Sequence, residues 1–259
     1  MTRESTARTD PSSGERDRYA VAVVGGGIAG LSASAFTARA GLETVVLDAG
    51  ESILRRNAHL ENFPGFPAGV NARLLLDMLG DQVENAGAER REATVAAVEN
   101  RDDGFAVETA DGERYHADYV IAATKNETSY LDGIDGVGII DRGKAFVDTD
   151  ERGRTGVDGL YAAGRLAEKP HQAVVCAGHG AEVAVTLLEE ADRGFYHDWV
   201  APEGYFTDRG REVPPGCEEI DDAERERREA ESLDAMREYF AEPHPDEQVT
   251  HPSLREEDE

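Results

Sequence analysis

Three glycines near the N-terminus have the spacing of a phosphate-binding turn. Gly25, Gly27 and Gly30 fit the pattern G-x-G-x-x-G, with Ile28 and Ala29 between the last two glycines. The first glycine permits the tight bend, the second lets a diphosphate approach the backbone, and the third lets a helix pack closely on a strand. Free N–H groups and the dipole at the helix N-terminus favour a negatively charged group. The pattern therefore predicts binding of a dinucleotide.

The segments around this turn have the patterns that a dinucleotide-binding unit needs. A short apolar run over 20–24 predicts a buried parallel strand, and a helix is expected over about 28–40, ending at Gly41. A second apolar run over 44–47 ends in Asp48. This acid lies about 20 residues past the glycines, where a carboxylate binds the adenosine ribose hydroxyls. A glycine-rich turn in another kind of α/β unit is the alternative.

Further along the chain the pattern alternates between loops, short strands and helices. The segment 48–70 contains Glu61-Asn62-Phe63-Pro64-Gly65-Phe66-Pro67, which predicts a stiff loop, and a loop this long is usually functional. We expect helices over about 72–86 and 172–190, a three-stranded meander over 95–98, 105–107 and 114–116, and buried strands over 119–124 and 159–164. The predicted fold class is α/β, a central parallel sheet with helices on one face and a β-meander on the other.

The composition excludes several classes of partner. The chain has 259 residues and a net charge of -27, and its only lysines are Lys125, Lys144 and Lys169. So acidic a surface argues against nucleic acid or an anionic membrane as partner. No apolar run reaches the length of a membrane span, and no signal peptide is apparent, so we expect a soluble cytoplasmic protein. Excess acid with few lysines is typical of halophiles; an ordinary acidic protein with acidic tails is the alternative.

The composition also divides the chain. We expect a disordered tail over 1–18, a nucleotide-binding domain over 19–192, and a C-terminal extension over 193–259 with an aromatic segment at 195–206, a charged helix over about 218–240 and a frayed end. Cys176 and Cys217 lie far apart and form no C-x-x-C, so neither a disulfide framework nor a redox dithiol is predicted. The apolar context of Cys176 favours a buried structural thiol. We expect no metal site.

Four segments together resemble the FAD-binding domain of low-molecular-weight thioredoxin reductases. They are Val23-Val24-Gly25-Gly26-Gly27-Ile28-Ala29-Gly30, Glu61-Asn62-Phe63-Pro64-Gly65-Phe66, Ile121-Ala122-Ala123-Thr124, and Gly159-Leu160-Tyr161-Ala162-Ala163-Gly164 with Gln172-Ala173. The second and fourth distinguish this family from a plain nicotinamide-binding Rossmann domain. The resemblance implies an FAD/NAD(P)-binding Rossmann-like fold with FAD as cofactor.

The resemblance also implies a role for each matching position. The glycine turn would bind the FAD diphosphate, Asp48 the adenosine ribose, and the backbone near Thr94 and Val95 the adenine. Asn62 would lie near the isoalloxazine ring, and Gln172 and Ala173 would face the flavin N1 and O2 edge, where a helix N-terminus stabilises negative charge. Other cofactor-binding positions would be Thr124, Gly164 and Arg165. His171 is the only histidine expected near the flavin, either as a proton donor or as a helix-cap residue.

The chain departs from the family pattern in three respects. The family inserts a nicotinamide-binding domain between its two FAD-domain halves, whereas here about 20 residues separate Thr124 from Lys144, too few for a βαβ unit of about 30 residues. The family's redox cysteine pair lies in that inserted domain. Arg165 stands where the family has aspartate, and Lys125 where it has glycine. Arg165 either pairs with the diphosphate or signals weakened FAD binding.

Three functions remain open at this point. The first is an FAD-dependent oxidoreductase that accepts and passes on two electrons, with NAD(P)H only as a transient donor and without the thioredoxin reductase dithiol mechanism. The others are a non-catalytic flavin-binding or assembly module and a family member that binds no flavin. The electron donor or acceptor is unidentified, and a homodimer is one possible assembly. Trp199, Tyr205 and Phe206 are expected to cover the flavin or form a dimer interface; anchoring elsewhere is the alternative.

Overall fold

A mixed sheet forms the centre of the molecule. The structure, a computed structural model, describes residues 18–191, 193, 197–251 and 253. Within these residues the main sheet has seven strands in the order β3-β2-β1-β6-β5-β4, and β9 also pairs with β6. Its strands are β1 (Arg18–Val24), β2 (Thr44–Asp48), β3 (Glu89–Glu92), β4 (Val95–Arg101), β5 (Gly104–Thr109), β6 (Arg114–Ala122) and β9 (Leu160–Ala162).

The strands in the middle of the sheet are parallel, as predicted. β1 pairs in parallel with β2 and β6, β2 with β3, and β6 with β9. Val21, Ala22 and Val23 of β1 are fully buried because both faces of the sheet are covered. An uninterrupted apolar run is what such a position requires.

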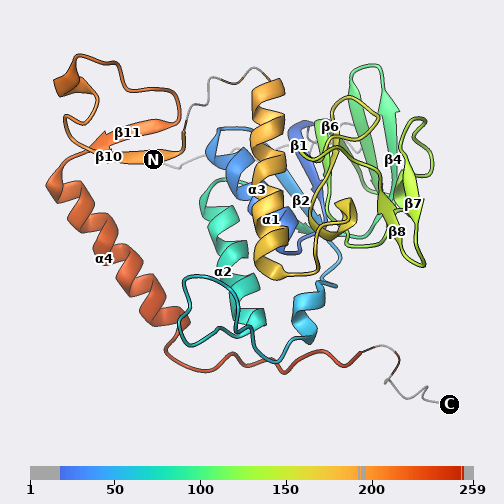
Figure 1. The fold of residues 1–259 in the computed structure, drawn as a ribbon, viewed down its shortest axis with the longest axis horizontal. Coiled ribbons are helices and arrows are strands. Elements are labelled where there is room, and N and C mark those ends of the chain that lie inside the picture. Colours follow the sequence, from blue (N-terminus) through green and yellow to red (C-terminus); the bar gives the residue numbers. More distant parts are fainter. Residues whose placement is uncertain (1–17, 192, 194–196, 252, 254–259) are drawn as a thin grey trace, which may run out of the picture.

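Three helices cover one face of this sheet (Figure 1). They are α1 (Ile28–Arg39), α2 (Ala72–Asn85) and α3 (Ala173–Glu190). Leu31, Leu75 and Leu187 from these helices join Val21 and Val23 in one buried core. The first turn of α1 lies against α3 so closely that a side chain on Gly180 would overlap the carbonyl group of Ala29. The α3 glycine therefore sets how close the two helices come.

The meander covers the other face, and its last strand differs from expectation. Val98, Phe105 and Val107 of β4 and β5 pack with Val24 and Leu47 in a second core. The segments expected as separate strands over 114–116 and 119–124 form the single strand β6. Its first half pairs with β5 in antiparallel fashion and its second half with β9 in parallel. Ala117 pairs on its two sides with Phe105 and Tyr19, which keeps the backbone extended between the two predicted strands.

A short excursion links β6 to β9. It contains the 3₁₀ helix η2 (Ser129–Leu131) and the hairpin β7 (Ile139–Asp141) and β8 (Ala145–Val147). The two ends of the excursion meet, because the Asn126 amide donates a hydrogen bond to the Ala145 carbonyl at 3.3 Å. After β9 the chain forms η3 (Gly164–Ala167) and enters α3.

The C-terminal extension is built from a small parallel pair of strands and one helix. It contains β10 (Trp199–Pro202), η4 (Thr207–Arg209), β11 (Cys217–Ile220) and α4 (Asp222–Tyr239). The helix predicted over 218–240 begins later because 217–220 pairs with β10. The Asp221 side chain caps it by accepting the Glu224 N–H at 2.7 Å. α4 has no buried residue and stands away from the sheet along most of its length (Figure 1), but at its end the Tyr239 hydroxyl donates to the Asp81 carboxylate of α2 at 2.5 Å.

The stretch after α4 returns to the main body. The Phe240 and Phe66 ring centroids lie 6.2 Å apart, His244 Nε2 lies 2.9 Å from an Asp77 carboxylate oxygen, and the Val249 N–H donates to the Arg55 carbonyl at 2.8 Å. The end expected to be frayed is thus packed through residue 249. At the other end, Arg18 already belongs to β1, and residues 1–17 of the expected tail lie outside the described residues. None of the described helices is both long and apolar enough to cross a bilayer.

Candidate dinucleotide-binding site

A cavity of about 850 Å³ opens beyond the carboxyl ends of β1, β2 and β6. Its volume lies in the range of about 300–1,000 Å³ that small-molecule sites have. Ligands of open α/β sheets bind in this crevice beyond the strand ends. The cavity is lined by the glycine turn, the loop after β2, the β3–β4 junction, the segment after β6, Arg165 and the start of α3.

The glycine turn has the backbone geometry that its sequence predicts. Gly25 has a φ of +109°, and a Cβ there would lie 2.8 Å from the Ala123 carbonyl oxygen. Gly27 caps α1 without a side chain, and the first turn of α1 carries no acid. The first N–H groups of a helix lack partners within it, so this helix start can bind an anion.

Two predicted glycines support the cavity instead of lining it. A Cβ on Gly30 would overlap the Gly25 carbonyl oxygen, and one on Gly164 would lie 2.6 Å from the Ala29 Cβ. Gly25, Gly27, Ile28 and Ala29 do line the cavity. Gly30 and Gly164 therefore act through close packing.

Asp48 and the β3–β4 junction lie together, as predicted. The Asp48 carboxylate lies so close to the turn that a side chain on Gly26 would overlap it, and its Oδ1 accepts the Gly50 N–H at 3.0 Å. The Ala93 N–H donates to the Asp48 carbonyl at 3.0 Å, which brings Thr94 and Val95 to the cavity wall. An acid and the backbone of Thr94 and Val95 thus share one end of the cavity.

Asn62 and Gln172 meet although 110 residues separate them. The Asn62 amide donates to Gln172 Oε1 at 2.9 Å, and both residues line the cavity with Ala173. Gln172 is the N-cap of α3 without capping it through its side chain, so the amide group is free to hold Asn62. The two positions predicted for the flavin ring form one wall.

Two histidines line the cavity, which corrects the expectation that His171 alone would lie there. Burial, with Lys125 and Arg165 nearby, lowers the pKa of His171. His59 is the second, and its Nδ1 lies 2.8 Å from a Glu61 carboxylate oxygen. No signal in the sequence placed His59 at the site, because it lies in the irregular loop after β2.

The sulfur chemistry of the site is that of a structural thiol. Cys176 is buried, and its Sγ lies 3.6 Å from the Pro170 carbonyl oxygen. Burial raises the pKa of this thiol, so the reactive thiolate is disfavoured. Both Cys176 and Cys217 are free.

Three cationic side chains line the same cavity. Lys125 follows Thr124, whose methyl group lies next to Gly25, and has a φ of +65°. This left-handed conformation costs about 1–2 kcal/mol for a residue with a side chain. Arg165 follows Gly164; its guanidinium lies 4.6 Å from the Phe146 ring centroid and donates to the Lys169 carbonyl at 3.1 Å. The third, Arg56, comes from η1 (Ile53–Arg56), a short helix that the sequence pattern does not predict.

Thr124 is held by two oxygen contacts. Its hydroxyl donates to the Glu127 carbonyl at 2.6 Å and lies 2.8 Å from the Tyr130 hydroxyl. Complete burial raises the Tyr130 pKa, so this phenol stays neutral. The segment after β6 is therefore fixed beside the glycine turn.

A buried histidine outside the predicted set positions Gly164. The Gly164 N–H donates to His179 Nδ1 at 3.0 Å, and the His179 residue is 4% exposed. Among the described residues His179 Nε2 has no hydrogen-bond partner. Burial, with Lys169 nearby, lowers the pKa of His179 to about 4, so the ring is neutral.

The aromatic segment lies elsewhere. Trp199, Tyr205 and Phe206 pack on one another, with the Trp199 and Tyr205 centroids 4.6 Å apart, and none of the three lines the cavity. The expectation that they cover the site is therefore wrong; Phe195 and Tyr196 lie outside the described residues. The neighbouring Asp198 carboxylate pairs with the Arg39 guanidinium at the last turn of α1. This contact anchors the segment away from the glycine turn.

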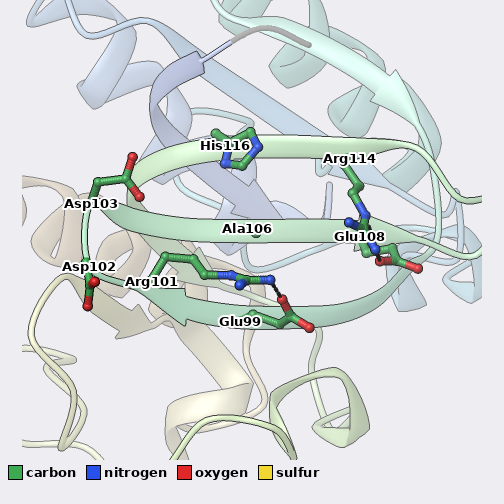
Figure 2. Close-up of a pocket in the computed structure, with 8 residues that line it drawn as sticks. All are labelled: Glu99, Arg101, Asp102, Asp103, Ala106, Glu108, Arg114 and His116. Atoms are coloured by element: carbon green, nitrogen blue, oxygen red, sulfur yellow. Dashed lines mark hydrogen bonds and ion pairs between the residues drawn. The ribbon is translucent and has the colours of Figure 1, made fainter. Parts of the chain in front are cut away.

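A second hollow lies on the outer face of the meander, and Figure 2 shows the side chains around it. Its charges neutralise one another in part: Arg101 pairs with Glu99, and Arg114 pairs with Glu108 at 2.7 Å (Figure 2). Exposed ion pairs of this kind contribute little. This hollow offers no arrangement comparable to the main cavity.

Sequence comparison finds relatives among thioredoxin reductases. The chain is 31% identical over 113 residues to a thioredoxin reductase of Rickettsia typhi, covering 43% of this chain and 36% of the relative. It is 36% identical over 126 residues to a bifunctional thioredoxin reductase/thioredoxin of Mycobacterium leprae, covering 48% of this chain and 27% of the relative. The matches thus span about a third of the length of these curated relatives.

Solved structures show the same fold. A thioredoxin reductase from Gloeobacter violaceus superimposes with a TM-score of 0.61 at 18% identity, covering 71% of this chain and 100% of that one. One from Streptococcus pyogenes gives a TM-score of 0.62 at 14% identity, covering 68% and 98%. These agreements support the α/β Rossmann-like class.

A sequence profile of one enzyme family covers most of the domain just described. The profile for "Pyridine nucleotide-disulphide oxidoreductase" matches residues 20–180, from the first strand of the sheet into α3. The matched region contains the glycine turn, Asp48, Asn62 and Gln172. This chain belongs to the pyridine nucleotide-disulphide oxidoreductase family.

Proposed function

We propose that the cavity binds FAD and that the chain is an FAD-dependent oxidoreductase. The observation that carries this proposal is that one cavity joins the glycine turn, Asp48 and the Asn62–Gln172 pair. The adenosine would lie by Asp48, Thr94 and Val95, the diphosphate at the glycine turn, and the isoalloxazine ring by Asn62, Gln172 and Ala173. The lack of room for a side chain at Gly25 and Gly26 fits this assignment.

FAD, when bound, supplies two-electron transfer between a donor and an acceptor. The protein's part is binding, orientation and electrostatics. The start of α3 presents free N–H groups at Ala173, and a helix N-terminus stabilises a nearby negative charge by about 0.3–1 kcal/mol when exposed. The Asn62–Gln172 hydrogen bond holds both amides in fixed orientations at that end. His171 is the candidate proton donor, although its lowered pKa keeps it mostly neutral at pH 7.

We infer that the chain is thioredoxin reductase-like without the dithiol chemistry of that enzyme. Its two cysteines are separated by 41 positions, and Cys176 is buried within the site wall. Electrons would pass between the flavin and a partner that docks transiently. NAD(P)H is a candidate only as a transiently docking donor, because the segment between Thr124 and Lys144 is too short for a nicotinamide-binding unit.

Purification tests this proposal directly. A yellow protein with a flavin spectrum supports the FAD site, and anaerobic bleaching by NADH, NADPH or a reduced partner supports the enzyme. A bound flavin that no donor reduces would instead support a non-catalytic binding or assembly module. A colourless protein that takes up no added FAD would contradict the proposal, and denaturation followed by cofactor analysis distinguishes loss during purification from lack of binding.

We further propose that the chain divides into a flavin domain over 19–192 and an extension over 193–259. We also propose that the protein works in a salt-filled cytoplasm. The net charge of -27 supports this, because high salt screens self-repulsion. A homodimer would give α4 a partner for Leu233, which is 56% exposed. Sedimentation in concentrated KCl tests the assembly state.

A further inference from the structure

The positive charges of this acidic protein are not evenly distributed. Most described arginines pair with a carboxylate, as Arg18 does with Asp118 and Arg154 with Asp150. Several described basic residues outside the cavity, such as Arg55 and Lys144, also make no such ion pair, but Arg56, Lys125 and Arg165 stand unpaired in the wall of the main cavity, which also contains carboxylates. None of the three charges is neutralised by a carboxylate of the described residues, although the Arg165 guanidinium is held by the Lys169 carbonyl and the Phe146 ring, so together they can attract an anionic ligand.

The backbone places two of these charges beside the glycine turn. A Cβ on Gly25 would lie 3.4 Å from the Thr124 methyl carbon, and Lys125 is the next residue. On the other side, Gly164 packs against Ala29 in the first turn of α1, and Arg165 is the next residue. The two cations therefore flank the helix start that can bind an anion.

The conformation of Lys125 indicates that its side chain has a role. Its φ of +65° is one that glycine adopts freely and other residues adopt only under strain. Burial and the repulsion from Arg56 and Lys144 lower the pKa of Lys125, so the neighbouring cations also disfavour its charge. The strained backbone and the position of Lys125 at the cavity wall therefore point to a role for its side chain there.

We propose that Arg56, Lys125 and Arg165 form a cationic clamp for the diphosphate group of the ligand at the glycine turn. This inference rests on the proposed function in naming FAD as the first source of that group. A second nucleotide bound beside the flavin is the other source. The clamp adds charge to an anion site that backbone N–H groups begin, since hydrogen bonds to a charged partner are roughly twice as strong as neutral ones.

Lys125→Gly is the sharpest test because the proposal predicts opposite effects on stability and binding. Glycine relieves the backbone strain, so the ligand-free protein should melt about 2–4 °C higher. The same variant should bind FAD about 10- to 100-fold more weakly, since a charge-assisted hydrogen bond is lost. Riboflavin, which lacks the diphosphate, should bind as it does to the wild type. Calorimetry and flavin fluorescence measure these quantities.

Arg165→Gln and Arg56→Gln should weaken FAD binding in the same way, and Lys169→Gln, which removes a lysine outside the cavity wall, is the matched control. Salt screens the attraction between the Lys125 charge and the diphosphate, so added KCl should weaken FAD binding less in Lys125→Gly than in the wild type. The clamp is refuted if all three variants keep the wild-type affinity for both FAD and inorganic pyrophosphate. It is also refuted if the variants lose as much affinity for riboflavin as they lose for FAD.

Inorganic pyrophosphate separates the remaining cases. The clamp belongs to a second ligand if the three variants keep their FAD affinity but their flavin-loaded forms no longer bind pyrophosphate. If the wild-type protein binds no FAD, the proposed function fails. Pyrophosphate binding that Lys125→Gly weakens would still support the clamp in that event.

Discussion

His179 should make the stability of this protein depend on pH. The pH range concerned lies above the range in which the carboxylates take up protons. The ring is buried against Gly164 with a pKa lowered from 6.5 to about 4. Between these values the unfolded chain binds a proton that the folded protein does not, so stability falls as the pH falls. The slope is about 1.4 kcal/mol per pH unit, which gives about 3 kcal/mol in total. Above about pH 6.5 the contribution is complete, and below about pH 4 it changes no further.

Urea unfolding of wild type and His179→Gln between about pH 7.5 and pH 4 measures this difference. Glutamine retains an oxygen that can accept the Gly164 N–H but does not titrate. The other titratable groups are common to both proteins, so their effects on stability cancel in the comparison. For Asp150, burial acts to raise the pKa, yet hydrogen bonds from Arg154 lower it overall, so the contribution of Asp150 to stability is lost at lower pH. We expect the stability difference between the two proteins to change by up to about 3 kcal/mol in favour of the variant on acidification. Parallel stability curves would refute the assignment of a neutral, buried His179.

Three further predictions concern packing, salt and the C-terminal contact. Gly180→Ala should destabilise the protein by about 1–3 kcal/mol because the added methyl overlaps Ala29. In Gly178→Ala, on the same helix, the added methyl meets no atom within 4 Å and should stabilise the protein by up to about 1 kcal/mol. Thermal melts that rank the two variants in the opposite order would contradict this packing. Raising KCl from low to molar concentration should increase the melting temperature, because screening reduces self-repulsion at a net charge of -27; a fall would count against the halophilic interpretation. Phe240→Ala should weaken FAD binding a few-fold, because it frees Phe66 in the loop beside Asn62. Leu233→Ala, on the exposed helix α4, is the control and should leave FAD binding unchanged. Equal FAD affinities of Phe240→Ala and the wild type would show that the Phe240–Phe66 contact does not support the site.

Local patterns and family resemblance predicted the parts of the site that depend on short stretches of backbone. The glycine turn, Asp48 and the start of α3 at Ala173 lie as expected, because strand, turn and helix signals there agree with one another. Asn62 and Gln172 were both named from the resemblance, yet only the fold shows that their amides share a hydrogen bond.

The missed features depend on contacts between distant residues. Arg56 reaches the cavity from a short helix inside an irregular loop, and His179 acts through a backbone N–H 15 positions away. Trp199 was expected near the site because it follows α3 in sequence. However, α3 carries the chain away from the cavity, and the Asp198–Arg39 ion pair fixes the segment at the far end of α1. Neither ion pairing nor helix direction leaves a periodic signal in the sequence.

The meeting of Asn126 with Ala145 has a consequence for how this scaffold can be modified. Both ends of the excursion lie at one point beside the cavity, held by a single side-chain hydrogen bond at 3.3 Å. A foreign module with closely spaced termini could be inserted at the exposed turn of Arg142 and Gly143, next to Ala145, while Tyr130 and the Glu127 carbonyl still hold Thr124 and the β6 and β9 strands stay paired. Any module placed there would be joined through Ala145 to Asn126, which lines the main cavity. This turn is thus a graft point, at which a peptide reporter or a new recognition domain can be joined to the wall of the main cavity.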